Sequence, residues 1–521
     1  MDILSQVVQL LDRYRLETID VLGNEDSTSR FTDFYRQVKD GKIKTDEEAA
    51  IYMYGAKALP TDSKYRFFKS QFKDRLLNTV YFIDTDSPQF SDFQKVYYAS
   101  LHEWGAINLL YRKGLFLPPN DLAERLLTTC IKYELTELCV LILDKLKNTY
   151  GRIIGDKKRY DEVKIMFWHY KEVWEAETIA EELFTDISIE YVKSTAFRPE
   201  TSLIAQESLD KLEDLKLKHN SFLFCHSYYC IKEAIYSAKN DWENVLIVCD
   251  EALTLFDSKP FNMKTFIGIF LNQKVIALLM LKRYNECKKT LDATLNLQEE
   301  GSFNWFKTME KKMLLCFHTE NFTEGYHTFK QVVAVKEFKN LQGHSAEIWK
   351  LFEANLYLAL SLGKLPQIEK NKKDAFGKFK LNKFLNEIPT FANDKKGMNI
   401  PVLTIQIALM VSEKMYDSLI DRLETMEKYL VRHVAKSDIA GYRSNQFIKA
   451  LLEIPKSGFS RVALARRTEK IMKDLSEVPF SLVSAGYKIE VMQYEYLWEE
   501  ILKLFGTKNI VVKRTAILRE A

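Results

Sequence analysis

The hydrophobic positions of this chain recur every three or four residues along most of its length, which is the period of an amphipathic α-helix. The clearest pattern is a motif in which a large side chain ends one helix, a short polar turn follows, and an aromatic residue begins the next helix. That aromatic residue falls at Trp242, Tyr284, Phe322 and Tyr416, and apolar or small residues follow it at +3, +7 and +10. This spacing buries one stripe of the second helix against the first, so each motif predicts a helical hairpin.

Three of these hairpins follow one another between residues 223 and 335 at intervals of about 40 residues, and a fourth lies at 401–430. They resemble the tetratricopeptide repeat (TPR), whose second helix carries an aromatic, a small, an aromatic and an alanine residue at this spacing. The best copy follows that series at four positions: Trp242, Val245, Cys249 and Ala252. Cys249 replaces the second aromatic residue, and Glu233 stands where the first helix of a TPR has a small residue. Because the interval exceeds the TPR length of about 34 residues, we expect longer helices.

The whole chain is predicted to be an all-α solenoid, because one hairpin cannot cover its own apolar face whereas a stack of hairpins can. Segments 89–150 and 157–220 have helical periodicity without the motif and predict further hairpins. The resemblance to TPR implies a right-handed array with a concave surface. The expected divisions are an N-terminal helical block (1–85), helical hairpins (86–222), TPR-like repeats (223–363), a Lys-rich insertion (364–400), C-terminal helical hairpins (401–505) and a short irregular tail (506–521).

The N-terminal block contains a short helix at 45–55, a turn, and a second helix from Lys64 to Ile83. One stripe of the second helix is aromatic or apolar: Tyr65, Phe68, Phe72 and Leu76. Four basic residues lie off that stripe: Arg66, Lys69, Lys73 and Arg75. The block resembles the DNA-binding module that precedes helical repeats in some bacterial activators, and this resemblance makes the four basic residues candidate DNA contacts. We favour the alternative, a hairpin that caps the solenoid, because short motifs of this kind often occur without the function.

The chain as a whole also resembles TPR-like proteins of Bacteroidota. The stretches that carry this resemblance are 46–49, 69–76, 383–387 and 496–499. The resemblance implies a bacterial source and a helical-repeat fold, and it brings no activity with it.

The composition agrees with a folded helical chain. Its 521 residues include 18 glycines and 11 prolines, well below the average usage of about 7% and 5%, which excludes a loop-rich β protein and a disordered chain. The net charge of +3 excludes a protein that binds nucleic acid through its overall charge. No stretch predicts a transmembrane helix or a signal peptide. The seven cysteines form no CxxC pair and indicate no disulfide framework, so we expect a cytoplasmic protein that does not bind membranes.

No arrangement of residues in the sequence predicts a reaction centre. Cys225 and His226 are neighbours, which points their side chains about 100° apart on a helix. Cys249, Cys287 and Cys316 fall at predicted core positions, where cysteine acts as a small apolar residue. The histidines and cysteines lack the short paired spacings of a zinc site. We therefore predict no catalytic residue, no metal, no cofactor, and a protein that is not an enzyme.

Positive charge gathers in two stretches. The insertion at 364–400 is rich in lysine, and a C-terminal basic patch opposes only Glu453 and Glu469. The patch contains Arg443, Lys449, Lys456, Arg461, Arg466, Arg467, Lys470 and Lys473. A solvated helix surface, an acidic protein partner and single-stranded nucleic acid all fit such a run of charge, although single strands favour more interleaved aromatic residues than it contains.

The predicted function is that of a protein–protein interaction scaffold, whose concave surface receives a peptide or helix of a partner. First helices of such arrays line the inner surface, and four residues there are the candidate contacts: Tyr228, Tyr229, Lys232 and Asn272. Two alternatives remain open. One is a transcriptional regulator with the N-terminal block on DNA and the repeats as a sensor arm. The other is a scaffold subunit of a bacterial signalling or defence complex.

Overall fold

The computed structural model describes Leu4, Val8 and residues 30–80, 92–114, 116–194, 199–261, 264–365, 381–386, 399–433, 439–480 and 490–506. Every regular element within these ranges is a helix, which confirms the all-α prediction. No helix among them is long and apolar enough to cross a membrane. Most of the Lys-rich insertion and nearly all of the C-terminal tail lie outside the described residues.

The second helices of the four motifs begin at the predicted aromatic residues. They are α11 (Trp242–Asp257), α13 (Tyr284–Leu295), α15 (Phe322–Ala334) and α20 (Tyr416–His433). The residues at +3, +7 and +10 of each helix are buried, including Cys249 and Cys287, which confirms that the motif marks a core stripe. At +3 of α15, Gly325 lies so close to α14 that an added Cβ would be 3.3 Å from the Cβ of Cys316.

A repeated turn joins the helices of these hairpins. Two residues before each second helix, one residue adopts the left-handed conformation, with φ of 56° at Asn240, 58° at Lys282, 56° at Glu320 and 57° at Lys414. The following residue donates its backbone N–H to the carbonyl five residues earlier, as Arg283 does to Leu278 at 2.9 Å. Left-handed conformations of non-glycine residues cost on the order of 1 kcal/mol, and this hydrogen bond, which satisfies a carbonyl at the helix end, offsets that cost.

The chain divides into two compact units, Met1–Tyr170 and Lys171–Ala521, and the boundary falls inside the long helix α8 (Lys157–Ser194). The first unit begins with the N-terminal block, which contains α2 (Arg30–Lys39), α3 (Asp46–Tyr54) and α4 (Ser63–Val80). The predicted stripe of α4 is buried against α2, where the rings of Phe34 and Phe72 meet edge to face with centroids 5.0 Å apart. Leu4 and Val8 belong to the same core.

The rest of the first unit has its own core. Its helices are α5 (Asp92–Arg112), α6 (Leu117–Lys132), α7 (Thr136–Thr149), the π-helical turn η2 (Tyr150–Ile154) and the first part of α8. Buried side chains of all these helices form one cluster, which includes Cys130, Cys139 and Phe167. The segment predicted as a hairpin at 89–150 is therefore three successive helices.

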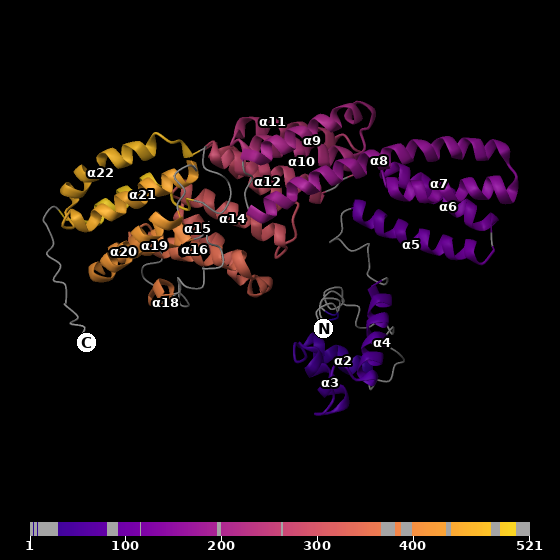
Figure 1. Ribbon diagram of the computed structural model, residues 1–521, viewed down its shortest axis with the longest axis horizontal. Coiled ribbons are helices and arrows are strands. Elements are labelled where there is room, and N and C mark those ends of the chain that lie inside the picture. The colour runs from indigo at the N-terminus through magenta and orange to yellow at the C-terminus, as the bar shows by residue number, and fades with distance from the viewer. Residues whose placement is uncertain are drawn as a thin grey trace. The chain divides into compact units, whose positions relative to one another are not determined.

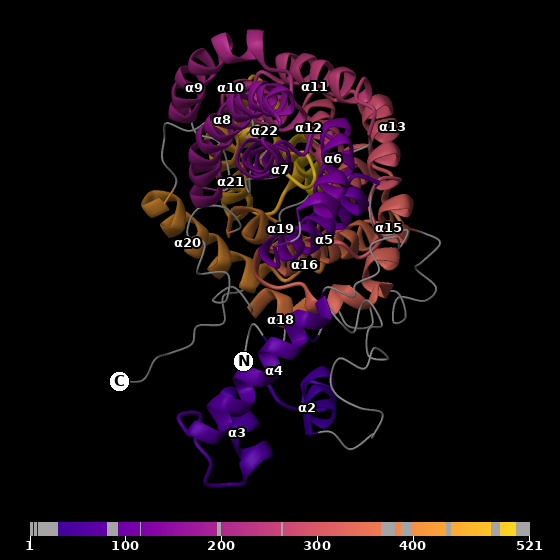
Figure 2. The same cartoon turned by 90° about the vertical axis from the view of Figure 1, so that its right-hand side faces the viewer.

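The second unit is a longer array (Figure 1). After the remainder of α8 come α9 (Pro199–Lys218), α10 (Phe222–Ala238), α11, α12 (Lys264–Met280), α13, α14 (Phe303–His318), α15, the 3₁₀ turn η3 (Lys336–Asn340), α16 (Gly343–Ser361), α18 (Leu381–Asn386), α19 (Asn399–Ser412), α20, α21 (Ile439–Lys456), α22 (Arg461–Ser476) and α23 (Tyr494–Leu504). From α9 to α15 each helix packs against the next. In Figure 2, α11, α13 and α15 follow the outer rim of this unit and α12 and α16 lie inside it, so we refer to the second helices of the hairpins as the outer layer and to the first helices, from α10 on, as the inner layer.

The insertion interrupts the sequence of the array without interrupting its packing. Among the described residues, helix α16 packs directly against α19, on the far side of the insertion in sequence. The short helix α18 docks on α19, where Phe384 is buried and its carbonyl accepts a hydrogen bond of 3.0 Å from the side chain of Gln406. Hairpin stacking therefore continues past the insertion.

The C-terminal segment 490–506 runs back along the turns of the array. The Gln493 amide donates to the Tyr284 hydroxyl at 2.9 Å, at the start of α13. His318, at the end of α14, hydrogen-bonds through Nε2 to the carbonyl of Glu490 at 2.8 Å. Further along, Glu500 pairs with Lys364 at 3.1 Å after α16, and backbone atoms of Gly506 and Arg461 join at 2.9 Å. One short segment thus connects turns of several successive hairpins.

A buried arginine fixes this segment in place. The Arg443 side chain in α21 is 1% exposed and donates five hydrogen bonds: to both carboxylate oxygens of Glu490 at 2.6 and 2.9 Å, to Glu495 at 2.8 Å, and to the carbonyls of Leu475 and Val478 at 3.1 and 2.8 Å. Burial alone would lower the pKa of Arg443, but the hydrogen bonds and charges of Glu490 and Glu495 outweigh it and raise that pKa. The guanidinium therefore remains charged with every N–H group paired.

The inner layer buries ionisable groups. In α10, Glu233 accepts hydrogen bonds from the Ser237 hydroxyl and, at 3.4 Å, from the Gln273 amide, and burial raises its pKa to about 7. Burial lowers the pKa of His226 and of His318 to about 4. At neutral pH these histidines are therefore uncharged, and the Glu233 carboxyl is partly protonated.

We predict that Arg443→Met destabilises the C-terminal part of the array strongly, because it leaves Glu490 as a buried charge without its partner. Loss of one member of a buried pair costs about 3–5 kcal/mol. Hydrogen exchange of the amides in α21–α23 measures the free energy of local opening. The exposed Arg466 supplies the control, since Arg466→Met should change this free energy by less than about 0.5 kcal/mol. Equal effects of the two substitutions would contradict the role given to Arg443.

We also predict that Glu233→Gln changes the pH dependence of stability. The pKa of Glu233 rises from 4.5 to about 7 on folding, so the wild type loses stability from this group as the pH increases through that window, by up to about 3 kcal/mol. The variant should therefore gain stability relative to the wild type between pH 5 and pH 8. Denaturation of both proteins at the two pH values measures this difference in the free energy of unfolding. The opposing contributions of His226 and His318 cancel, because both proteins contain these histidines. A difference that is the same at both pH values would rule out the buried titration.

Candidate functional site

An open hollow lies on the second unit at α10 and α11. It has a volume of about 700 Å³. Its lining residues are Tyr229 from α10, Ile247, Asp250, Glu251, Thr254 and Leu255 from α11, and Ser258 just after α11. Ile247, Glu251 and Thr254 follow one another at helical spacing of three or four residues, so they share the exposed face of α11. Ile247 is 55% exposed, so it contributes an apolar group to the surface of the hollow.

Tyr229 gives this hollow an aromatic wall beside positive charge. The ammonium groups of Lys216 in α9 and Lys232 in α10 each lie 6.0 Å from the centre of its ring. That distance is within the range of a cation–π attraction, which holds the ring between the two lysines. Burial and the charge of Glu251 raise the pKa of Tyr229, so its hydroxyl remains protonated.

The carboxylates of the hollow are held from the inner layer. Lys232 in α10 pairs with Glu251 at 2.7 Å, and Lys274 in α12 pairs with Asp250. The side chains of Glu251 and Asp250 are 43% and 55% exposed, so both carboxylates still face solvent. Exposed ion pairs of this kind contribute about 0–1 kcal/mol each, and a ligand cation can therefore share these carboxylates at little cost.

The four predicted inner-surface residues do not form one site. Tyr229 lines the hollow, and Lys232 pairs with Glu251, another residue of its lining. Tyr228 is buried, and its hydroxyl donates to Glu213 in α9 at 2.9 Å. Asn272 in α12 donates to the carbonyl of Gly268 at 2.9 Å and accepts from the Thr308 hydroxyl at 3.1 Å. Tyr228 and Asn272 therefore join helices to one another.

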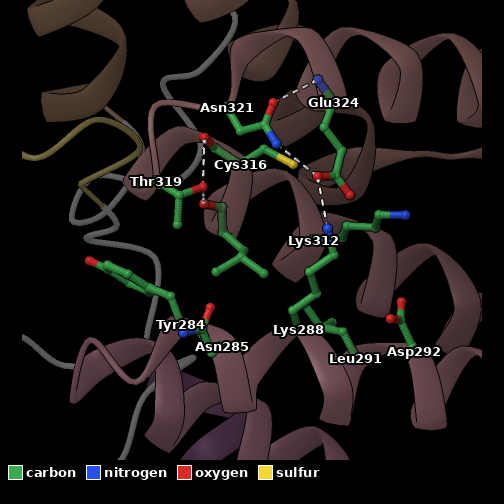
Figure 3. A pocket seen from close by; sticks show the side chains of 11 residues that line it. Tyr284, Asn285, Lys288, Leu291, Asp292, Lys312, Cys316, Thr319, Asn321 and Glu324 are labelled. Atoms are coloured by element: carbon green, nitrogen blue, oxygen red, sulfur yellow. Dashed lines mark hydrogen bonds and ion pairs between the residues drawn. The ribbon is translucent and has the colours of Figure 1, made fainter.

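A second groove on the outer layer, between α13 and α15, is closed by its own side chains (Figure 3). Lys288 in α13 reaches across to Glu324 in α15 at 3.2 Å, and the Asn321 amide donates to the same carboxylate at 2.9 Å. The remaining cavity is about 90 Å³, which is room for about three water molecules. This groove stabilises the stacking of two hairpins and offers little space for a ligand.

The C-terminal basic patch is smaller than the sequence predicts. Arg443 does not belong to it, because its side chain is buried against Glu490 and Glu495. Arg467 and Lys456 both pair with Glu453, at 2.7 and 2.8 Å. The remaining predicted members are exposed: Lys449 in α21, and Arg461, Arg466, Lys470 and Lys473 in α22.

Two of the four candidate DNA contacts are engaged inside the N-terminal block. Lys69 donates to both carboxylate oxygens of Asp46, at 2.7 and 3.0 Å. Burial would raise the pKa of Asp46, but hydrogen bonds from Lys69 and Tyr65 outweigh it and lower that pKa to about 2. The guanidinium of Arg75 lies 4.1 Å from the centre of the Phe31 ring. Arg66 and Lys73 are exposed. This distribution favours a structural role for Lys69 and Arg75.

The cysteines are all buried free thiols. Cys225 and His226 point to different partners, because Cys225 contacts Lys216 and Asn220 whereas His226 contacts Cys230 at 3.6 Å. Burial raises the pKa of Cys230, which keeps this thiol protonated and unreactive. Within the described ranges, no three His, Cys, Asp or Glu side chains are grouped so that they could hold a metal ion.

Sequence reasoning missed the outer hollow because it looked for contacts on the first helices. The hollow lies mostly on the second helix α11, where Ile247 is an exposed apolar residue on an otherwise polar face. Single exposed aliphatic residues are common on protein surfaces, so this residue alone could not have identified the hollow from the sequence. Comparison of the chain with known protein families, curated proteins and solved structures finds no match, so its function has to be argued from these residues.

Proposed function

We propose that this chain is a non-enzymatic helical-repeat scaffold, with TPR-like hairpins, that binds a segment of another protein. The observation that carries the proposal is the open hollow on α10 and α11, where an aromatic ring, an exposed isoleucine, a half-buried leucine and two solvent-facing carboxylates meet. A rigid repeat array suits this task, because neighbouring helices hold such a surface in place without a ligand.

The chemistry of the hollow indicates the kind of segment that fits it. Ile247, Leu255 and the ring of Tyr229 offer an apolar surface for a leucine, methionine or aromatic side chain. Asp250 and Glu251 lie beside that surface and favour a lysine or arginine next to the apolar anchor. We therefore propose a partner segment in which an apolar residue and a basic residue lie within one helical turn.

This proposal moves the binding surface from the inner to the outer layer. Tyr228 and Asn272 are occupied by contacts between helices, whereas Tyr229 lines the open hollow. The C-terminal segment also covers part of the edge formed by the turns. These contacts favour the outer hollow over the inner face as the place where a partner binds. The cytoplasmic location expected from the sequence is part of the same proposal.

Selection of peptides from a display library against the full-length protein tests the proposal. We expect enrichment of peptides that combine an apolar anchor with a nearby lysine or arginine. Ile247→Glu, and separately Asp250→Lys with Glu251→Lys, should each weaken binding of the best peptide by about tenfold, because about 1.4 kcal/mol of contact or charge attraction is lost. Fluorescence anisotropy of the labelled peptide measures these affinities.

The matched control is Ile165→Glu, which changes an exposed isoleucine in the first unit. Peptide affinity should be the same in this variant as in the wild type. Enriched peptides without a basic residue, or an affinity that both groove variants leave unchanged, would refute the proposed site.

A further inference from the structure

The second half of α8 presents an acidic stripe to solvent. Glu172, Glu175, Glu182 and Asp186 are exposed and lie three, seven and four residues apart in turn. Ile179 and Ile189 continue the same spacing and are 37% and 44% exposed. Residues at these intervals share one face of a helix. None of the four carboxylates forms an ion pair within the part of the chain that the structure describes. The stripe therefore carries four negative charges beside two aliphatic groups, and the exposed Lys171, four residues before Glu175, lies at its start.

Helix α22, near the other end of the second unit, presents a basic stripe. Arg466, Lys470 and Lys473 are exposed on one face and form no side-chain ion pair with any described residue. Val462 opens the same face and is 64% exposed. Glu469, three residues after Arg466 and four before Lys473, shares this face, and Glu477 lies just beyond the end of the helix. The stripe thus combines three cations, one carboxylate and one aliphatic side chain, and its net charge is opposite to that of the α8 stripe.

We propose that α22 of one copy of this chain docks on the acidic stripe of α8 in a second copy. At 1.5 Å per residue, the stripe from Glu172 to Ile189 is about 26 Å long and the stripe from Val462 to Lys473 is about 17 Å long, so the basic stripe fits within the acidic one. Val462 then covers Ile179 or Ile189 while the three cations meet carboxylates. Both stripes are exposed in the single chain, so a second copy has to supply the contact.

The composition of the two stripes favours a second copy over nucleic acid. A nucleic acid would engage only the basic stripe and would find no aromatic side chain in the stripe for its bases to stack on. A second copy neutralises both stripes at once and covers their aliphatic groups. Because exposed ion pairs contribute about 0.2–1 kcal/mol each, we expect a weak association that salt reduces.

Sedimentation velocity of the full-length protein tests this inference. The wild type should associate reversibly at a concentration of about 100 μM in low salt, and the assemblies should dissociate when the salt concentration is raised about tenfold, because salt screens exposed charges. Glu175→Lys with Glu182→Lys, and separately Arg466→Glu with Lys470→Glu, should each give a monomer. All four residues are exposed, so circular dichroism and melting should confirm an unchanged fold.

Charge restoration makes the test specific. A mixture of the two reversed variants, and a single chain that carries all four substitutions, should both regain the association of the wild type. The sedimentation coefficient also gives the geometry, since reciprocal contacts close a dimer and one-way contacts extend into an open chain. A wild type that stays monomeric, an association that either reversal leaves intact, or a four-substitution chain that fails to associate would overturn the proposal. If the wild type is monomeric and binds single-stranded DNA, and the Arg466→Glu with Lys470→Glu variant loses that binding, α22 would be assigned to nucleic acid instead. None of these outcomes bears on the α10–α11 hollow.

Discussion

The array depends on the burial of one apolar stripe in each second helix. The stripes of α11, α13, α15 and α20 are buried against neighbouring helices, and a hairpin with its stripe in water has no stable core of its own. Each hairpin therefore requires a neighbour, and hairpins that follow one another in sequence pack against one another. The inner helices are covered from both sides as a result. This is why α10 holds Glu233 and His226 where burial disfavours the charged form of each side chain.

The C-terminal end of a helical array also needs contacts that hold it to the rest of the chain. Here the segment 490–506 folds back and contacts turns that lie 136 to 211 residues earlier. Arg443 holds that segment through Glu490, and burial of both charges carries a desolvation cost. The geometry compensates for that cost, since all five N–H groups of the guanidinium find acceptors in three different parts of the chain. The pair therefore specifies where the C-terminal segment lies.

Features that depend on nearby residues could be predicted from the sequence, and features that depend on distant residues could not. The starts of α11 and α13 and their buried positions follow from local periodicity. The sequence places Arg443 in the basic patch because a run of basic residues does not show which way each side chain points. Its partner Glu490 lies 47 residues away in sequence. Lys69 and Asp46, 23 residues apart, illustrate the same limit. Tyr228 and Tyr229 are neighbours in sequence, yet only the second lines a hollow, because one residue turns a helix by about 100°.

The two outer grooves show how one backbone arrangement can be closed or open. In the groove between α13 and α15, Lys288 on one outer helix bonds Glu324 on the next, so the ion pair spans the groove. At α11, the cations that hold Asp250 and Glu251 come from the inner helices α12 and α10, so the ion pairs lie below the groove and the carboxylates keep a face toward solvent. The helix that supplies the lysine therefore decides whether a groove joins two hairpins or stays available to a partner.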